Sequence, residues 1–152
     1  MKALSLLQPW ASLVAYGRKK IETRTWGTRY RGPLAIHASK SDIALGALAL
    51  ASDPTLELMT GELCKGGLDV TLVPLPFGRI IALCDLVGVE RITPENVPPE
   101  PERSFGDYRP GRYAWHLSNI RRLNPCPEAK GHLGLWNPPD PEGLAFLEVR
   151  PS

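Results

Sequence analysis

Cysteine is scarce in this sequence, and its spacing argues against two kinds of site. The three cysteines, Cys64, Cys84 and Cys126, form no C-x-x-C pair and have no paired histidines beside them. A disulfide framework needs an even, regularly spaced set of cysteines, and a structural zinc site needs closely spaced ligands. We therefore expect neither, and no metal-ligating residue is predicted.

Long hydrophobic runs are lacking as well. The mostly apolar segment from Ala3 to Leu7 ends at Gln8-Pro9-Trp10, which makes it too short for the core of a signal peptide. No run approaches the roughly 20 apolar residues that a membrane-spanning helix needs. We expect a cytoplasmic protein with no membrane segment.

Acidic residues are almost absent from the first forty positions. Glu22 is the only one there, against eight lysines and arginines, so residues 1–40 carry a net charge of +7. The rest of the chain has 10 basic and 15 acidic residues, a net charge of −5. A basic segment of this kind is the electrostatic footprint of a phosphate-bearing partner, although a solvated basic face has the same composition.

The apolar residues that are present suffice for one compact domain over residues 1–152, of which 43% are hydrophobic. Helices are expected at 9–16, 41–51 and 54–64, and residues 93–111 should form a long loop that is mobile or a lid. These elements, with the strands, favour an α+β fold, a partly open mixed β-barrel flanked by short helices. The expected strands cover 2–7, 21–26, 34–38, 78–92, 112–123 and 133–136.

One segment carries a motif. Residues 17–24 read Gly-Arg-Lys-Lys-Ile-Glu-Thr-Arg and fit the pattern G-x-K-x-x-E-x-R. Together with Leu4 to Ala11, and with further likeness at 29–39, 111–115 and 130–136, this segment resembles the ASCH family, the activating-signal-cointegrator homology domains. The resemblance implies a PUA-like β-barrel with a cleft at the motif. It also implies one of three activities: nucleic-acid binding, metal-dependent RNA cleavage, or hydrolysis of acetylated cytidine.

Lys19 and Glu22 are the candidate catalytic residues. An ammonium at a turn meets a phosphate, or, if it loses its proton beside Arg18 and Lys20, serves as a base. Glu22 offers a carboxylate that takes a proton, orients water or shares a metal ion with other ligands. The acetylcytidine hydrolases have a threonine where this chain has Glu22, and Thr23 would point elsewhere on a strand. A divalent metal is expected only if the protein is a ribonuclease.

Gly17 and Arg24 frame the motif. Gly17 is expected to end the first helix in the left-handed conformation, which costs glycine no Cβ strain. Arg24 has two interpretations that stay open. Its planar guanidinium clamps a phosphate, or it pairs with Glu22, because both lie on one strand face about 7 Å apart.

Basic and aromatic side chains complete the candidate site. Trp10 and Trp26 flank the motif and are the expected base-stacking surfaces, whereas the alternation around Trp115 is typical of a core. His37 and His116 fall inside strands and are expected to be structural. The predicted nucleic-acid-binding residues are Lys19, Lys20, Arg24, Trp10, Trp26, Arg29, Arg31, Ser39 and Lys40.

The sequence leaves three functions open. The first is a module that binds RNA or a nucleotide-like ligand in a basic cleft at the motif. The second is a hydrolase that uses the same cleft, either a divalent-metal-dependent ribonuclease or an amidohydrolase on a modified nucleoside such as acetylcytidine. The third is a protein-interaction domain for an acidic partner, which nothing in the sequence names. RNA binding is preferred, because it needs charge and stacking, while chemistry also needs a tuned proton carrier.

Overall fold

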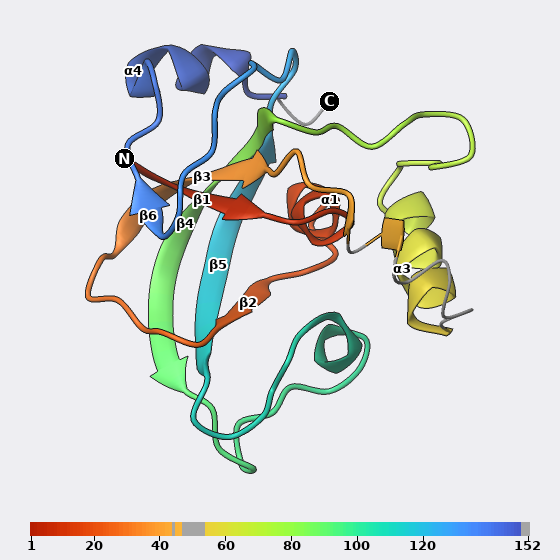
Figure 1. The fold of residues 1–152 in the computed structure, drawn as a ribbon, viewed down its shortest axis with the longest axis vertical. Helices are drawn as coiled ribbons and strands as arrows, with labels where there is room; N and C mark the ends of the chain where they lie inside the picture. The colour runs from red at the N-terminus through yellow and green to blue at the C-terminus, as the bar shows by residue number, and fades with distance from the viewer. Residues whose placement is uncertain (44, 47–53, 150–152) are drawn as a thin grey trace.

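A mixed six-stranded sheet dominates the computed structural model, which describes residues 1–43, 45–46 and 54–149 (Figure 1). The strand order is β2-β5-β4-β3-β1-β6, with β1 parallel to β3 and all other neighbours antiparallel. The sheet curls into a half-barrel, which confirms the expected α+β, partly open mixed barrel. The strands are β1 (Lys2–Leu6), β2 (Ile21–Arg24), β3 (Gly32–Ala38), β4 (Arg79–Arg91), β5 (Tyr113–Arg122) and β6 (Leu135–Trp136).

Short helices surround the sheet. Helix α1 (Trp10–Ala15) packs directly on it, and α3 (Pro54–Lys65) lies at its side and packs on α1 through Leu13, Met59 and Leu63. Helix α4 (Pro141–Leu144) and two 3-10 turns, η1 (Glu102–Phe105) and η2 (Ala145–Leu147), complete the described elements. Within the described ranges, no helix has the length and apolarity to cross a membrane.

The core covers both faces of the central strands. Successive side chains of a strand point to opposite faces. In β3, Leu34 and Ile36 belong to the cluster formed with α1, whereas Ala35 packs on the other face with Leu123 and Trp136. A strand buried on both faces needs apolar residues in succession, which explains the run at 34–36.

Most element boundaries agree with the sequence expectations to within one residue, and those of three strands differ by two; one of these, the strand expected at 34–38, begins at Gly32. The strand expected at 21–26 ends at Arg24, and the one expected at 133–136 pairs only at Leu135–Trp136. The segment 93–111 contains the turn η1 and buries Phe105 to 1% exposure, so it is anchored to the core by one aromatic side chain. The helix expected at 41–51 falls largely outside the described residues.

Candidate functional site

The motif begins where α1 ends. Gly17 adopts φ +71°, as expected for a glycine that closes a helix, and its N–H donates to Val14 O at 2.9 Å. The next two amides, those of Arg18 and Lys19, both donate to Leu13 O. The chain therefore reverses tightly and enters β2 with Lys19 and Glu22 facing the interior.

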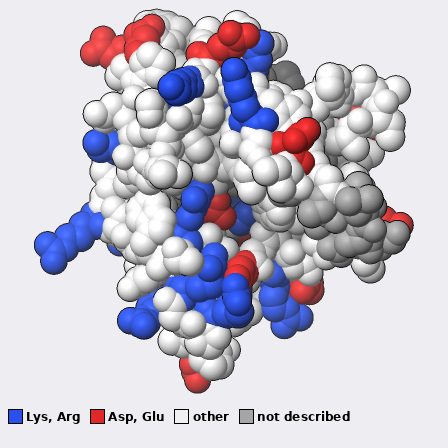
Figure 2. Space-filling model, in the orientation of Figure 1, with Lys and Arg blue, Asp and Glu red and all other residues white. Residues whose placement is uncertain are grey.

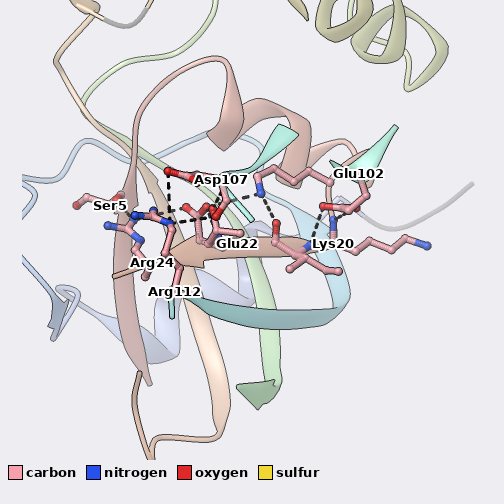
Figure 3. Close-up of polar contacts among 10 residues, drawn as sticks. Ser5, Lys20, Glu22, Arg24, Glu102, Asp107 and Arg112 are labelled. Carbon is pink, nitrogen blue, oxygen red and sulfur yellow. Dashed lines mark hydrogen bonds and ion pairs between the residues drawn. The ribbon is translucent and has the colours of Figure 1, made fainter. Parts of the chain in front are cut away.

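Glu22 lies between two cations (Figure 3). Lys19 is fully buried, donates to Ile21 O, and places Nζ 3.6 Å from Glu22 Oε1. Arg24 Nη2 lies 3.5 Å from Glu22 Oε2, which confirms the structural ion pair as one role of Arg24. Glu22 Oε1 also accepts the N–H of Thr23 at 2.9 Å. Both carboxylate oxygens are thus engaged, and the Lys19 ammonium is directed into the protein.

Arg24 leaves one buried donor without a partner among the described residues. Its Nη2 donates to the backbone oxygen of Ser5 at 2.8 Å, which ties β2 to the end of β1. Its Nε is buried and has no hydrogen-bond partner among the described residues. Buried polar atoms of this kind are rare in folded proteins, and each calls for a partner such as a water molecule or a ligand.

The loop between β4 and β5 bends back and forms the opposite wall of the site (Figures 1 and 3). The Glu102 carboxylate accepts the N–H groups of Lys20 and Ile21, each at 3.0 Å. Asp107 N–H donates to Thr23 Oγ1 at 3.0 Å. The expected lid segment is therefore hydrogen-bonded to the motif at two places.

Asp107 adds a second negative charge to this wall. A hydrogen bond from Arg109 lowers the pKa of its carboxyl to about 2, so it is ionised at neutral pH. Arg112 Nε donates to the Asp107 backbone oxygen at 3.0 Å and lies 3.6 Å from its carboxylate. Glu22 and Asp107 therefore each form an ion pair with an arginine, Arg24 and Arg112 respectively.

These walls enclose a cavity of about 630 Å³, a size typical of small-ligand sites. Figure 2 shows a hollow on this face, with acidic atoms inside it between basic ones. From the predicted set, only Trp10, Glu22, Arg24 and Trp26 line the cavity. The full lining is Ser5, Leu7, Trp10, Glu22, Thr23, Arg24, Thr25, Trp26, Thr55, Met59, Ser104, Phe105, Gly106, Asp107 and Arg112.

The other predicted site residues lie elsewhere. Lys19 is behind the cavity wall, and Lys20 has an exposed side chain. Arg29 and Arg31 are exposed on the connection from β2 to β3 and do not line this cavity. Trp115 is fully buried with Trp26 packed edge-on against it, the ring centroids 4.7 Å apart, as its core assignment predicts.

Ser39 and Lys40 line a second cavity of about 1080 Å³, on the other side of Ser5. His37 is buried there and bonded to Ser5 Oγ at 3.0 Å and to Ala129 O at 2.8 Å, which fits its expected structural role. The rest of the lining is Phe77, Gly78, Glu128, Ala129, Lys130, Gly131, His132 and Leu133.

Sequence reasoning missed the contribution of the loop to the site. Ser104, Phe105 and Asp107 line the cavity from a segment with no recognisable motif, and Arg112 lines it from the segment 111–115, which resembles the family but was not predicted to contribute to the site. The available signal was the acidic excess after residue 40, which indicates that acidic residues of later segments pack against the basic segment. That signal does not say which acids return.

The motif does not fit a divalent metal ion. Glu22 is flanked by two cations at 3.5 and 3.6 Å, which would oppose a bound cation. In the described part of the chain, no three His, Cys, Asp or Glu side chains lie close enough together to hold a metal. The metal-dependent ribonuclease expected as one alternative therefore has no ligand set among these residues.

Comparison with known protein families gives a match. The family model of the ASCH domain matches residues 4–127. This range includes the motif, both walls of the cavity beside it, and the loop between β4 and β5. No curated protein matches the chain.

Proposed function

Because the chain belongs to the ASCH domain family, we propose that it binds single-stranded RNA and takes one unstacked nucleotide into the cavity at the motif. Proteins that read single-stranded RNA commonly stack splayed-out bases on aromatic rings and bond to their edges. A cavity of about 630 Å³ suits one nucleotide, whereas a duplex cannot enter it.

The observation that carries this proposal is the guanidinium of Arg24 beside two tryptophans in one cavity. The Arg24 side chain is 26% exposed and lines the cavity, so its guanidinium can donate to a carbonyl or ring nitrogen of a base. Trp10 and Trp26 are half-buried and line the same cavity, where they offer flat apolar surface for stacking.

Hydrolysis through the same cavity is the weaker alternative. A catalytic carboxylate or amine must reach the atom whose proton it moves. Both oxygens of Glu22 already face N–H groups or cations, and Lys19 is fully buried and does not line the cavity. Lys19 is thus out of reach of a substrate, and Glu22, although it lines the cavity, contacts two cations that a catalytic step would have to separate from it, so we do not propose an amidohydrolase.

The test is fluorescence anisotropy with a labelled single-stranded RNA octamer of mixed sequence. We expect binding that weakens as salt rises, because phosphate contacts release counterions. Trp10→Ala should cost about 1–3 kcal/mol of binding free energy, whereas Trp10→Phe, which keeps a stacking ring, should weaken binding less.

Arg24→Gln supplies the second arm, with Arg91→Gln as its control because Arg91 is exposed and lines neither cavity. Both variants remove one positive charge, but only Arg24→Gln should weaken binding strongly. The proposal is wrong if the octamer does not bind, or if duplex RNA of the same sequence binds equally well.

A further inference from the structure

The second cavity adjoins the first through a single residue. Ser5 lines both: its backbone oxygen holds Arg24 on one side, and its hydroxyl contacts His37 on the other. A strand that places one nucleotide at the motif can therefore continue past Ser5 into the neighbouring hollow.

The two cavities differ in their free charge. At the motif, Arg24 and Arg112 are offset by Glu22 and Asp107. In the second cavity, Lys40 and Lys130 are exposed and have no ion-pair partner among the described residues. The acid in its lining, Glu128, is matched by Arg79 at 2.8 Å. The unpaired positive charge thus lies in the second cavity.

The polar groups at the base of this cavity are already satisfied. Ala129 O can only accept, so His37 Nε2 carries the proton and Nδ1 accepts the hydroxyl proton of Ser5. Trp136 Nε1 donates to the same hydroxyl at 3.2 Å. A Cβ added to Gly131 would lie 2.7 Å from Ser5 Oγ, so the backbone covers this group closely. A ligand is consequently recognised by the rim of the cavity.

One of the rim lysines is held in place along its stem. A Cβ added to Gly78 would lie 2.7 Å from Lys40 Cε and 2.8 Å from its Cγ, so the aliphatic chain of Lys40 lies directly across Gly78. A lysine whose aliphatic chain is already packed loses less side-chain conformational entropy when its ammonium binds a ligand. Lys40 is thus arranged to present its charge to the cavity.

We propose that the second cavity holds a phosphate of the adjoining nucleotide of the same RNA strand, contacted by Lys40 and Lys130. This inference rests on the proposed function, and it divides the recognition between two places. The motif cavity, whose charges are paired, takes an uncharged base, and the second cavity takes the charged backbone. The ligand is then an oligonucleotide and not a free nucleoside.

The test compares how two variants change the salt dependence of octamer binding. Lys40→Gln with Lys130→Gln should weaken binding on the order of tenfold at about 50 mM salt, and should lower the slope of log K against log salt by about 0.7 for each phosphate that is no longer neutralised. Trp10→Ala should weaken binding without changing that slope. Lys65→Gln with Arg91→Gln removes two positive charges away from both cavities and is the control.

The outcomes separate the inference from the proposed function. If the octamer binds and the Lys40/Lys130 variant matches its control in affinity and slope, the phosphate site is wrong while RNA binding stands. If the wild-type protein binds no RNA at all, both fail. Since both lysines are exposed, the variant should fold normally, which circular dichroism verifies.

Discussion

Glu22 is the only acid among the first forty residues, and the two cations beside it, Lys19 and Arg24, explain why it is there. A fully buried lysine is costly unless an opposite charge and hydrogen-bond acceptors compensate for its missing hydration. Lys19 has both, from Glu22 and from Ile21 O. The spacing of the motif lysine, glutamate and arginine therefore places one carboxylate between two cations, and stability explains this pattern without any catalytic step.

Replacing Lys19 by methionine should destabilise the fold. It leaves the Glu22 carboxylate, 9% exposed, with Arg24 as its remaining ion-pair partner among the described residues. We expect the free energy of unfolding to fall by about 3 kcal/mol, the lower end for a broken buried pair, because Arg24 remains. Urea denaturation measures this, and Lys20→Met is the control, because the Lys20 side chain is exposed. Equal stability of the two variants would contradict a structural role for Lys19.

At the scale of elements, the loop between β4 and β5 supplies hydrogen-bond acceptors to an edge strand, β2. β2 is the last strand of the described sheet on its side and pairs with β5 alone. An edge strand leaves backbone N–H groups unpaired. Glu102 takes the N–H groups of Lys20 and Ile21 at the start of β2, so the loop and the motif stabilise each other.

Glu102→Gln should loosen this connection, because an amide presents one acceptor oxygen where the carboxylate presents two. We expect the free energy of unfolding to fall by about 1.5 kcal/mol, the scale of one charge-assisted hydrogen bond. Amide hydrogen exchange at Lys20 and Ile21 should accelerate. Glu95→Gln, an exposed change in the same loop, should leave both exchange rates as they are. No difference between the variants would show that Glu102 does not hold the loop to the motif.

At the scale of the whole molecule, folding redistributes the charge asymmetry of the chain. Glu62, Glu102 and Asp107 all come from the acidic part, and Glu62 pairs with Arg18 at 2.6 Å. These contacts offset part of the basic segment around the motif, whereas Lys40 and Lys130, far apart in the chain, line one cavity. Of the two cavities, the one at the motif therefore has its charges paired, although the motif lies in the most basic segment of the sequence.

The buried His37 makes stability depend on pH across the molecule, since it links β1, β3 and the segment before β6. Burial is the main cause that lowers its pKa below 6.5, and the nearby His132 lowers it further. As pH falls, the unfolded chain binds this proton first, so the stability from neutral His37 is complete above about pH 6.5 and declines below it.

Urea unfolding at pH 7.5 and pH 5.5 should therefore show a less stable protein at the lower pH. His37→Asn should reduce this difference, whatever its effect on stability at pH 7.5. His116→Asn should retain it, because His116 is partly exposed and bonded to Glu90. An unchanged pH difference in His37→Asn would exclude His37 as its source.

The sequence by itself determined the family motif, the α+β class and the order of most strands and helices, and it offered the pairing of Glu22 with Arg24 as one of two interpretations. Those features are local: apolar alternation, glycine at a helix end, and two residues on one strand face depend on neighbours within a few positions. The candidate site could be predicted only in part, through Trp10, Trp26 and the motif.

Only the tertiary structure decided which charges are paired and which are free. The burial of Lys19, the return of Glu102 and Asp107 to the motif, and the meeting of Lys40 with Lys130 all depend on segments far apart in the chain. Charge in a sequence is additive, but an electrostatic interaction depends on distance and burial, which sequence position does not specify. The same basic segment thus contains one fully buried lysine, one arginine that lines a cavity while paired with Glu22, and one lysine that lines a second cavity.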